Sequence, residues 1–168
     1  MNTNLLILAF IIIFMLHNLE EIITVERWMK RTYPRVRKRI PLFAQKEIEK
    51  FQDITAAQFA VVVFVLSIPC SALILVAAVT EHYFLFLGLN LIFALNIFTH
   101  PLQSLFLRCY TPGVWTSILL VIPYNILFFY HFAKAGMLTM NTIAASFVVA
   151  VLFIPVFLLS HKIGEKWS

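Results

Sequence analysis

The residues with the clearest capacity for chemistry are His17, Glu20 and Glu21, in the sequence His-Asn-Leu-Glu-Glu. They follow an apolar run that extends from Leu5 to Leu16. In a helix, spacings of three and four residues place these three side chains on one face. Because ionisable groups are costly to bury in hydrocarbon, such a cluster in a membrane segment indicates a functional site.

A second polar group lies on a later apolar segment of the chain. Asn96, His100 and Gln103 are spaced so that they share one helix face. If both segments cross a membrane in the same direction, His17 and His100 each lie about 10 Å below the same membrane surface. We therefore expect the two histidines to converge in one buried site, with Asn96 and Gln103 as hydrogen-bonding neighbours.

The composition identifies the class of protein that must position these groups. The chain of 168 residues is 61% hydrophobic and only 12% charged, and its mean hydropathy is +0.90. Its apolar runs match the ~20 residues that a transmembrane helix needs. We predict an all-α, polytopic membrane helix bundle in one membrane-embedded domain over residues 1–168, with five transmembrane helices at about 4–23, 56–79, 83–107, 114–132 and 141–160.

The basic residues predict the orientation of this bundle. Of the 13 Lys and Arg residues, nine lie in the loop 24–55, between Arg27 and Lys50. Five spans place all the others on the same side as this loop, except Lys134. By the positive-inside rule, the N-terminus of this multi-pass protein then faces outside the cell (inner) membrane, and the loop and the C-terminus are cytoplasmic. The net charge of +5 is explained by orientation and by attraction to membrane lipids, without a nucleic acid.

Two loop segments have recognisable patterns. Ala44, Ile48, Phe51 and Thr55 repeat at helical spacing after Pro41, which predicts an amphipathic helix at the cytoplasmic membrane surface that leads into the second span. We expect the preceding basic segment, Arg27–Arg39, to be irregular. Pro112-Gly113 predicts a turn about 10 Å above the proposed site. Near that turn, two side chains are candidate contacts for anionic headgroups, Arg108 and Tyr110.

Three kinds of chemistry are open to the polar site. A divalent metal, zinc or iron, could be bound by mixed nitrogen and oxygen ligands from His17, Glu20, Glu21 and His100. Without a metal, Glu20 and Glu21 are the candidate catalytic residues, because adjacent carboxylates in a low-dielectric pocket repel each other and one becomes a stronger base. In the third alternative the same side chains form a structural hydrogen-bond network between helices.

These residues resemble a known pattern. A His-x-x-Glu-Glu sequence at the end of an N-terminal span, followed by a basic loop, resembles the HXXEE family of small bacterial membrane proteins, which is named for this motif. His100 and the segment RCYTPGVWTS, Arg108–Ser117, also look like the family's pattern. The resemblance implies a shared intramembrane site at His17, Glu20, Glu21 and His100, and it implies no substrate.

The motif is also similar to that of glutamate-type intramembrane proteases of the CAAX-processing kind. Those proteases have an arginine four residues after the second glutamate, where this chain has Val25, and they have Phe-x-x-x-His where this chain has Asn96 before His100. We also expect no second histidine at matching depth on a later span, because His131 lies toward the outer side. These departures argue against membership of that protease family.

The favoured interpretation is a membrane-embedded, metal-dependent enzyme that acts on a lipid-soluble substrate. One alternative is a non-catalytic membrane protein, either a small-ligand or ion carrier or an assembly factor, whose polar residues form a structural network. A second alternative is a metal-free, glutamate-type intramembrane hydrolase. The substrate, the reaction and the oligomeric state do not follow from the residues.

The charge distribution makes a testable prediction about topology. Because twelve of the 13 basic residues fall on one side of five spans, a reporter at the C-terminus should be active on the cytoplasmic side. A tag at the N-terminus should be accessible from outside intact cells. Labelling of a cysteine at Lys46 by an impermeant reagent added outside the cell would contradict the predicted orientation.

Overall fold

The computed structural model describes residues 3–167 and has no β-strand among them. Five helical segments of this part of the chain are long and apolar enough to cross a membrane: Thr3–Arg31, Ala56–Thr80, Tyr83–Leu107, Val114–Lys134 and Met140–Glu165. The predicted fold class, an all-α membrane helix bundle, is therefore confirmed. The protein is a multi-pass membrane protein.

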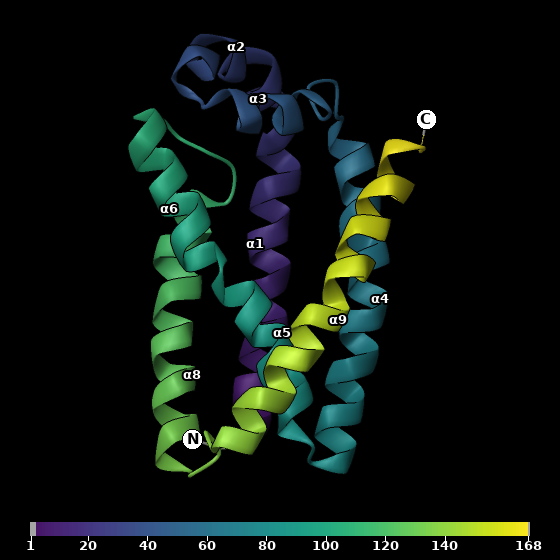
Figure 1. Ribbon diagram of the computed structural model, residues 1–168, viewed down its shortest axis with the longest axis vertical. Helices are drawn as coiled ribbons and strands as arrows, with labels where there is room; N and C mark the ends of the chain where they lie inside the picture. The colour runs from purple at the N-terminus through teal and green to yellow at the C-terminus, as the bar shows by residue number, and fades with distance from the viewer. Residues whose placement is uncertain (1–2, 168) are drawn as a thin grey trace.

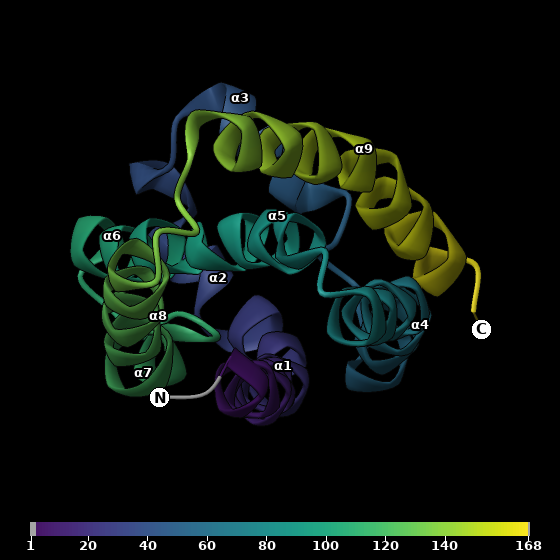
Figure 2. The same ribbon diagram turned by 90° about the horizontal axis from the view of Figure 1, so that it is seen from below.

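The spans pack around the third segment. Its first half, α5 (Tyr83–Ala94), lies between α1 (Thr3–Arg31) and α9 (Met140–Glu165) when the bundle is viewed along its length (Figure 2). The helix α4 (Ala56–Thr80) packs against α1, α5 and α9. On the other side lie α6 (Asn96–Leu107) and α8 (Ile122–Lys134) (Figure 1).

The first helix is longer than its apolar run. We predicted that the span ends near residue 23 and that the basic segment Arg27–Arg39 is irregular, but α1 continues as helix to Arg31. The reason is local, because the chain has no proline or glycine before Pro34 to end the helix. The rest of the segment forms α2 (Tyr33–Val36) and the short 3₁₀-helix η1 (Arg37–Arg39).

The predicted amphipathic helix is present as α3 (Leu42–Glu49), but it ends before Phe51 and Thr55, because Thr55 instead caps the next helix. Its Ala44 and Ile48, with the following Phe51, pack against a small hydrophobic cluster of Met29, Tyr33, Val36, Ile40, Ile54 and Leu107, whereas Leu42 and Phe43 are exposed. This cluster joins α1, α2 and α3 at one end of the bundle, which we call the basic end (Figure 1). The next helix, α4, begins with a capping box between Thr55 and Gln58.

The third span is broken in the middle. The helix is interrupted at Leu95, where backbone hydrogen bonds tighten to the i→i−3 pattern, and Pro101 lies inside the second half. Proline has no N–H group and clashes with the carbonyl four residues earlier, so it bends a helix. At the interruption, α6 leaves the direction of α5 (Figure 1). This bend matters for the site, because His100 lies on α6.

The fourth span begins well inside the bundle. From the end of α6 the chain turns back along the bundle and starts α7 (Val114–Thr116), which continues through the π-helical segment η2 (Ser117–Val121) into α8 (Figure 1). A hydrogen bond of 3.0 Å from the Asn90 amide to Asn125 joins α5 to α8 inside the apolar core. Single π-helical turns often occur at functional sites.

Candidate metal site

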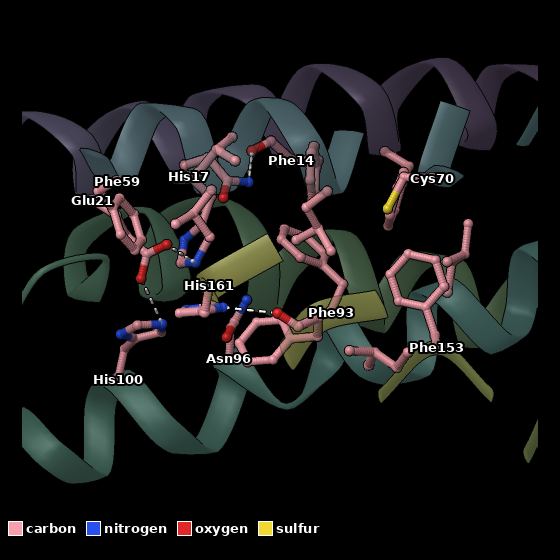
Figure 3. A pocket seen from close by; sticks show the side chains of 18 residues that line it. Phe14, His17, Glu21, Phe59, Cys70, Phe93, Asn96, His100, Phe153 and His161 are labelled. Atoms are coloured by element: carbon pink, nitrogen blue, oxygen red, sulfur yellow. Dashed lines mark hydrogen bonds and ion pairs between the residues drawn. The ribbon is translucent and has the colours of Figure 1, made fainter. Parts of the chain in front are cut away.

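The two predicted histidines meet in the structure. His17 on α1 and His100 on α6 have ring centroids 5.1 Å apart, at an interplanar angle of 69°. The His17 side chain is buried, with 1% of its surface exposed. The expected convergence of the first and third spans is therefore confirmed (Figure 3).

Glu21 lies between the two imidazole rings. Its carboxylate oxygens are 3.9 Å from Nε2 of His17 and 3.4 Å from Nε2 of His100. One ligand atom from each of the three side chains can be chosen so that all three atoms lie within 4.8 Å of one another. The group has the composition of a metal site with two histidines and one carboxylate. We call it the His-Glu-His group.

Glu20, the neighbouring glutamate, faces a different partner. Its carboxylate accepts hydrogen bonds from the Tyr110 hydroxyl at 2.8 Å, the Trp115 N–H at 3.2 Å, and both the N–H and the hydroxyl of Thr116 at 2.7 and 2.6 Å. Trp115 and Thr116 belong to the first turn of the fourth span, whose N–H groups have no partner within the helix. Glu20 therefore caps the start of that span, and it does not join the His-Glu-His group.

Thr116 connects Glu20 to His17. Its hydroxyl oxygen lies 2.8 Å from Nδ1 of His17 and 2.6 Å from Glu20. The hydroxyl has a single hydrogen, and the short contact assigns that hydrogen to the Glu20 carboxylate rather than to the Gly113 carbonyl at 3.3 Å. The oxygen then accepts from Nδ1 of His17, so Nδ1 carries the ring proton.

This assignment determines which nitrogen of His17 can bind a cation. With the proton on Nδ1, the lone pair of Nε2 points toward Glu21. That Nε2 atom is buried and has no hydrogen-bond partner among the described residues. Buried polar atoms usually have one, so an orphaned acceptor next to a carboxylate is the feature expected of a ligand-binding atom.

The turn at Gly113 closes over both histidines. A Cβ atom at this position would lie 2.9 Å from Cε1 of His17 and 3.0 Å from Cε1 of His100, and the φ angle of Gly113 is +79°. Glycine satisfies both requirements, since it has no side chain and adopts positive φ readily. We predicted this turn about 10 Å above the site, and the structure corrects that position because the chain folds back into the bundle before the fourth span begins.

A cavity of about 300 Å³ lies next to the His-Glu-His group. Phenylalanine and aliphatic side chains from α1, α4, α5 and α9 form most of its wall. Its polar lining residues are His17, Asn18, Glu21, Asn96, His100 and His161. A mostly apolar cavity with a few convergent polar groups is the usual form of a small-molecule site (Figure 3).

The other predicted residues are distributed unevenly. Asn96 lines the cavity, but its side chain makes no hydrogen bond to the His-Glu-His group among the described residues, whereas Gln103 is exposed on α6 and lies outside the cavity. Of the two predicted headgroup contacts, Arg108 is exposed and Tyr110 is hydrogen-bonded to Glu20. Burial is the main reason that the pKa of Tyr110 rises to about 12, so its hydroxyl keeps the proton that it donates to Glu20.

Two residues at the site were not predicted. Thr116 appears in the sequence as an ordinary threonine at the start of an apolar span. His161 corrects our expectation that no later span carries a second histidine at matching depth, because it lies on α9 near the basic end and lines the cavity. The depth argument that pairs His17 with His100 does not select His161, because His161 lies one residue beyond the predicted end of the fifth span at residue 160.

The fold and the site define a small multi-pass membrane protein with a His/Glu group inside its membrane-spanning helices. Residues 8–128 match the family described as "Protein of unknown function with HXXEE motif". The match covers well over half of the chain, and the chain belongs to this family. It is 29% identical over 162 residues to the uncharacterized protein YrkK of Bacillus subtilis (strain 168), over 91% of each chain. No solved structure matches it.

The contact between the first and third spans can be tested by crosslinking. In a background without Cys70 and Cys109, the pair His17→Cys and His100→Cys should be joined efficiently by a short bifunctional thiol reagent, because the two rings are in contact. The pair His17→Cys and His131→Cys is the control, since His131 lies near the C-terminal end of α8, whereas the site lies beyond the N-terminal end of that helix. Equal crosslinking of both pairs, or none in the first pair of a normally folded variant, would contradict this contact.

Proposed function

We propose that the His-Glu-His group binds a divalent metal, zinc or iron, and that the protein is a membrane-embedded enzyme acting on a lipid-soluble substrate. The observation that carries this proposal is the position of His17, Glu21 and His100. Their ligand atoms cluster within 4.8 Å, at the polar part of an otherwise apolar cavity.

The geometry of the ligand atoms supports a metal. A tetrahedral zinc ion with bonds of about 2.1 Å separates its ligand atoms by about 3.4 Å. The two distances from the Glu21 carboxylate to the histidine nitrogens are 3.4 and 3.9 Å, so small side-chain rotations suffice. Two histidines and one glutamate are the protein ligands of several zinc hydrolases, and two histidines with one carboxylate also bind non-haem iron.

The residues that surround the candidate metal ligands support the same proposal. Metal-bound histidines usually donate their other ring N–H to an acceptor that sets the tautomer and the ring orientation. Thr116 provides that acceptor for Nδ1 of His17, and the Glu20 carboxylate holds Thr116 in turn. The side-chain NH₂ group of Asn18 donates to the Phe14 carbonyl at 2.7 Å, and this bond does not use the side-chain oxygen. Asn18 also lines the cavity.

The cavity supports a lipid-soluble substrate. Its volume of about 300 Å³ and its phenylalanine-rich wall suit an apolar molecule better than a polar metabolite. A bound metal would supply Lewis-acid activation of a water molecule or a substrate oxygen. The residues of this chain would hold the ligands in position, exclude bulk water through the aromatic wall, and orient polar substrate atoms through Asn18, Asn96 and His161.

Metal analysis of the purified protein tests this proposal directly. Full-length protein prepared without chelators should contain about one zinc or iron ion per chain, and His17→Ala, His100→Ala and Glu21→Gln should each remove most of it. The matched controls are His82→Ala and His131→Ala, which also remove an imidazole but lie outside the cavity lining.

Two outcomes of that experiment would reject the metal. One is wild-type protein that stays metal-free after zinc or iron is added back, and the other is equal loss in all the histidine variants. Activity in Glu20→Gln and Glu21→Gln would then distinguish the remaining alternatives. Loss of activity in Glu21→Gln alone would favour a glutamate-type hydrolase. Unchanged substrate binding together with a lowered free energy of unfolding would favour a structural network.

Thr116 provides a separate test of the tautomer assignment. Thr116→Val keeps the shape but removes the hydroxyl, so zinc affinity should fall about 10–100-fold, as for other outer partners of metal-bound histidines. Thr116→Ser should retain wild-type affinity. Ser117→Ala is the control, because the Ser117 hydroxyl is buried nearby without a hydrogen-bond partner in the described part of the chain. The ¹⁵N shifts of the His17 ring give a readout that needs no metal, and unchanged shifts in Thr116→Val would contradict the assignment.

A further inference from the structure

A second cavity, of about 420 Å³, lies at the basic end of the bundle. It is formed by the last turns of α1, the start of α2 and the loop that precedes the fourth span. Its lining residues are Thr24, Arg27, Trp28, Arg31, Thr32, Arg35 and Tyr110. Three guanidinium groups and no carboxylate are among them, so the cavity is strongly positive. We call it the arginine pocket.

The backbone explains how three arginines come to face one cavity. Arg27 and Arg31 are one helical turn apart on the extension of α1 beyond its apolar run. The chain then turns at Thr32, whose carbonyl accepts from the N–H of Arg35 at 3.0 Å, and this bond brings Arg35 back toward the end of α1. The unexpected length of α1 is therefore what builds the pocket.

The arginines of the pocket differ from other basic residues nearby. Lys30 is bonded to Glu26 at 2.6 Å, Arg37 forms an ion pair with Glu49, and Arg39 donates to the Leu107 carbonyl at 2.7 Å. In contrast, the guanidinium groups of Arg27, Arg31 and Arg35 have no hydrogen bond or ion pair with any residue that the structure describes. A positive cavity whose charges lack internal partners is suited to an external anion.

We propose that the arginine pocket binds a phosphate-bearing anion. Guanidinium groups form paired hydrogen bonds with phosphate oxygens, and three of them can surround a single phosphate group. The pocket lies at the end of the membrane-spanning helices, where the headgroups of anionic phospholipids lie. A lipid headgroup and free inorganic phosphate share this chemistry, and the test below separates them.

The position of Tyr110 gives this site a link to the His-Glu-His group. Tyr110 forms one wall of the arginine pocket, where its carbonyl accepts from Nε1 of Trp28 at 2.6 Å. Its hydroxyl donates to Glu20, which is bonded through Thr116 to His17. A ligand in the pocket therefore lies against the same hydrogen-bonded chain that orients His17. The proposal does not require a metal at the His-Glu-His group.

Lipid binding by full-length protein in a neutral detergent tests the proposal. Native mass spectrometry can count bound dioctanoyl phosphatidylglycerol, with dioctanoyl phosphatidylcholine as the zwitterionic comparison and inorganic phosphate as a competitor. Wild-type protein should retain phosphatidylglycerol in preference to phosphatidylcholine. The triple variant Arg27→Gln, Arg31→Gln, Arg35→Gln should lower the affinity at least about tenfold.

A second triple variant controls for net charge. Lys38→Gln, Lys162→Gln, Lys166→Gln removes the same charge from exposed positions at the same end of the bundle but leaves the pocket intact, and it should stay within about twofold of wild type. If both triple variants weaken binding equally, or if phosphatidylglycerol and phosphate both fail to bind wild-type protein, the proposal is wrong. Displacement of the lipid by millimolar phosphate would identify free phosphate as the occupant. Should the first triple variant unfold, Arg31→Gln compared with Arg31→Lys measures the same effect.

Discussion

The start of the fourth span inside the bundle is the constraint on which the site depends. A helix that begins below the membrane surface leaves the N–H groups of its first turn without water or helix carbonyls to bind. Glu20 resolves this problem, since its carboxylate accepts from the N–H groups of Trp115 and Thr116 and from two hydroxyls. Hydrogen bonds to charged groups contribute about 1.5–3 kcal/mol each, so this contact ties α1 firmly to α7.

The position of α7 then determines the geometry of the histidines. Because the helix starts at this depth, Gly113 lies directly against both imidazole rings, and Thr116 lies within hydrogen-bond distance of Nδ1 of His17. The kink in the third span brings His100 to the same place from the opposite side. A straight third helix would carry His100 along the axis of α5. The segment Arg108–Ser117 thus has a structural explanation, as the stretch that lets the fourth span begin next to the site.

Much of this arrangement follows from simple properties of the sequence. Hydropathy identifies the five spans, and equal depth in two spans of the same direction is enough to pair His17 with His100. The separate roles of Glu20 and Glu21 do not follow from spacing, because residues three and four positions after His17 lie on either side of it around the helix. Which side faces the cavity and which faces α7 depends on tertiary packing. The role of Thr116 could not be predicted from the sequence for the same reason, since only the fold brings a residue 99 positions from His17 into contact with its ring.

The structural and functional interpretations of the polar cluster therefore apply to different residues. Glu20 is a partly buried group whose hydrogen bonds account for its position, because three donors from the start of the fourth span and the Tyr110 hydroxyl surround it. Glu21 has no comparable set of donors, and its nearest polar neighbours are two histidine nitrogens that are themselves potential ligands. A cluster that existed only to hold helices together would gain nothing from leaving His17 Nε2 without a partner. This difference between adjacent glutamates is the physical reason for assigning the capping role to Glu20 and the proposed metal to Glu21.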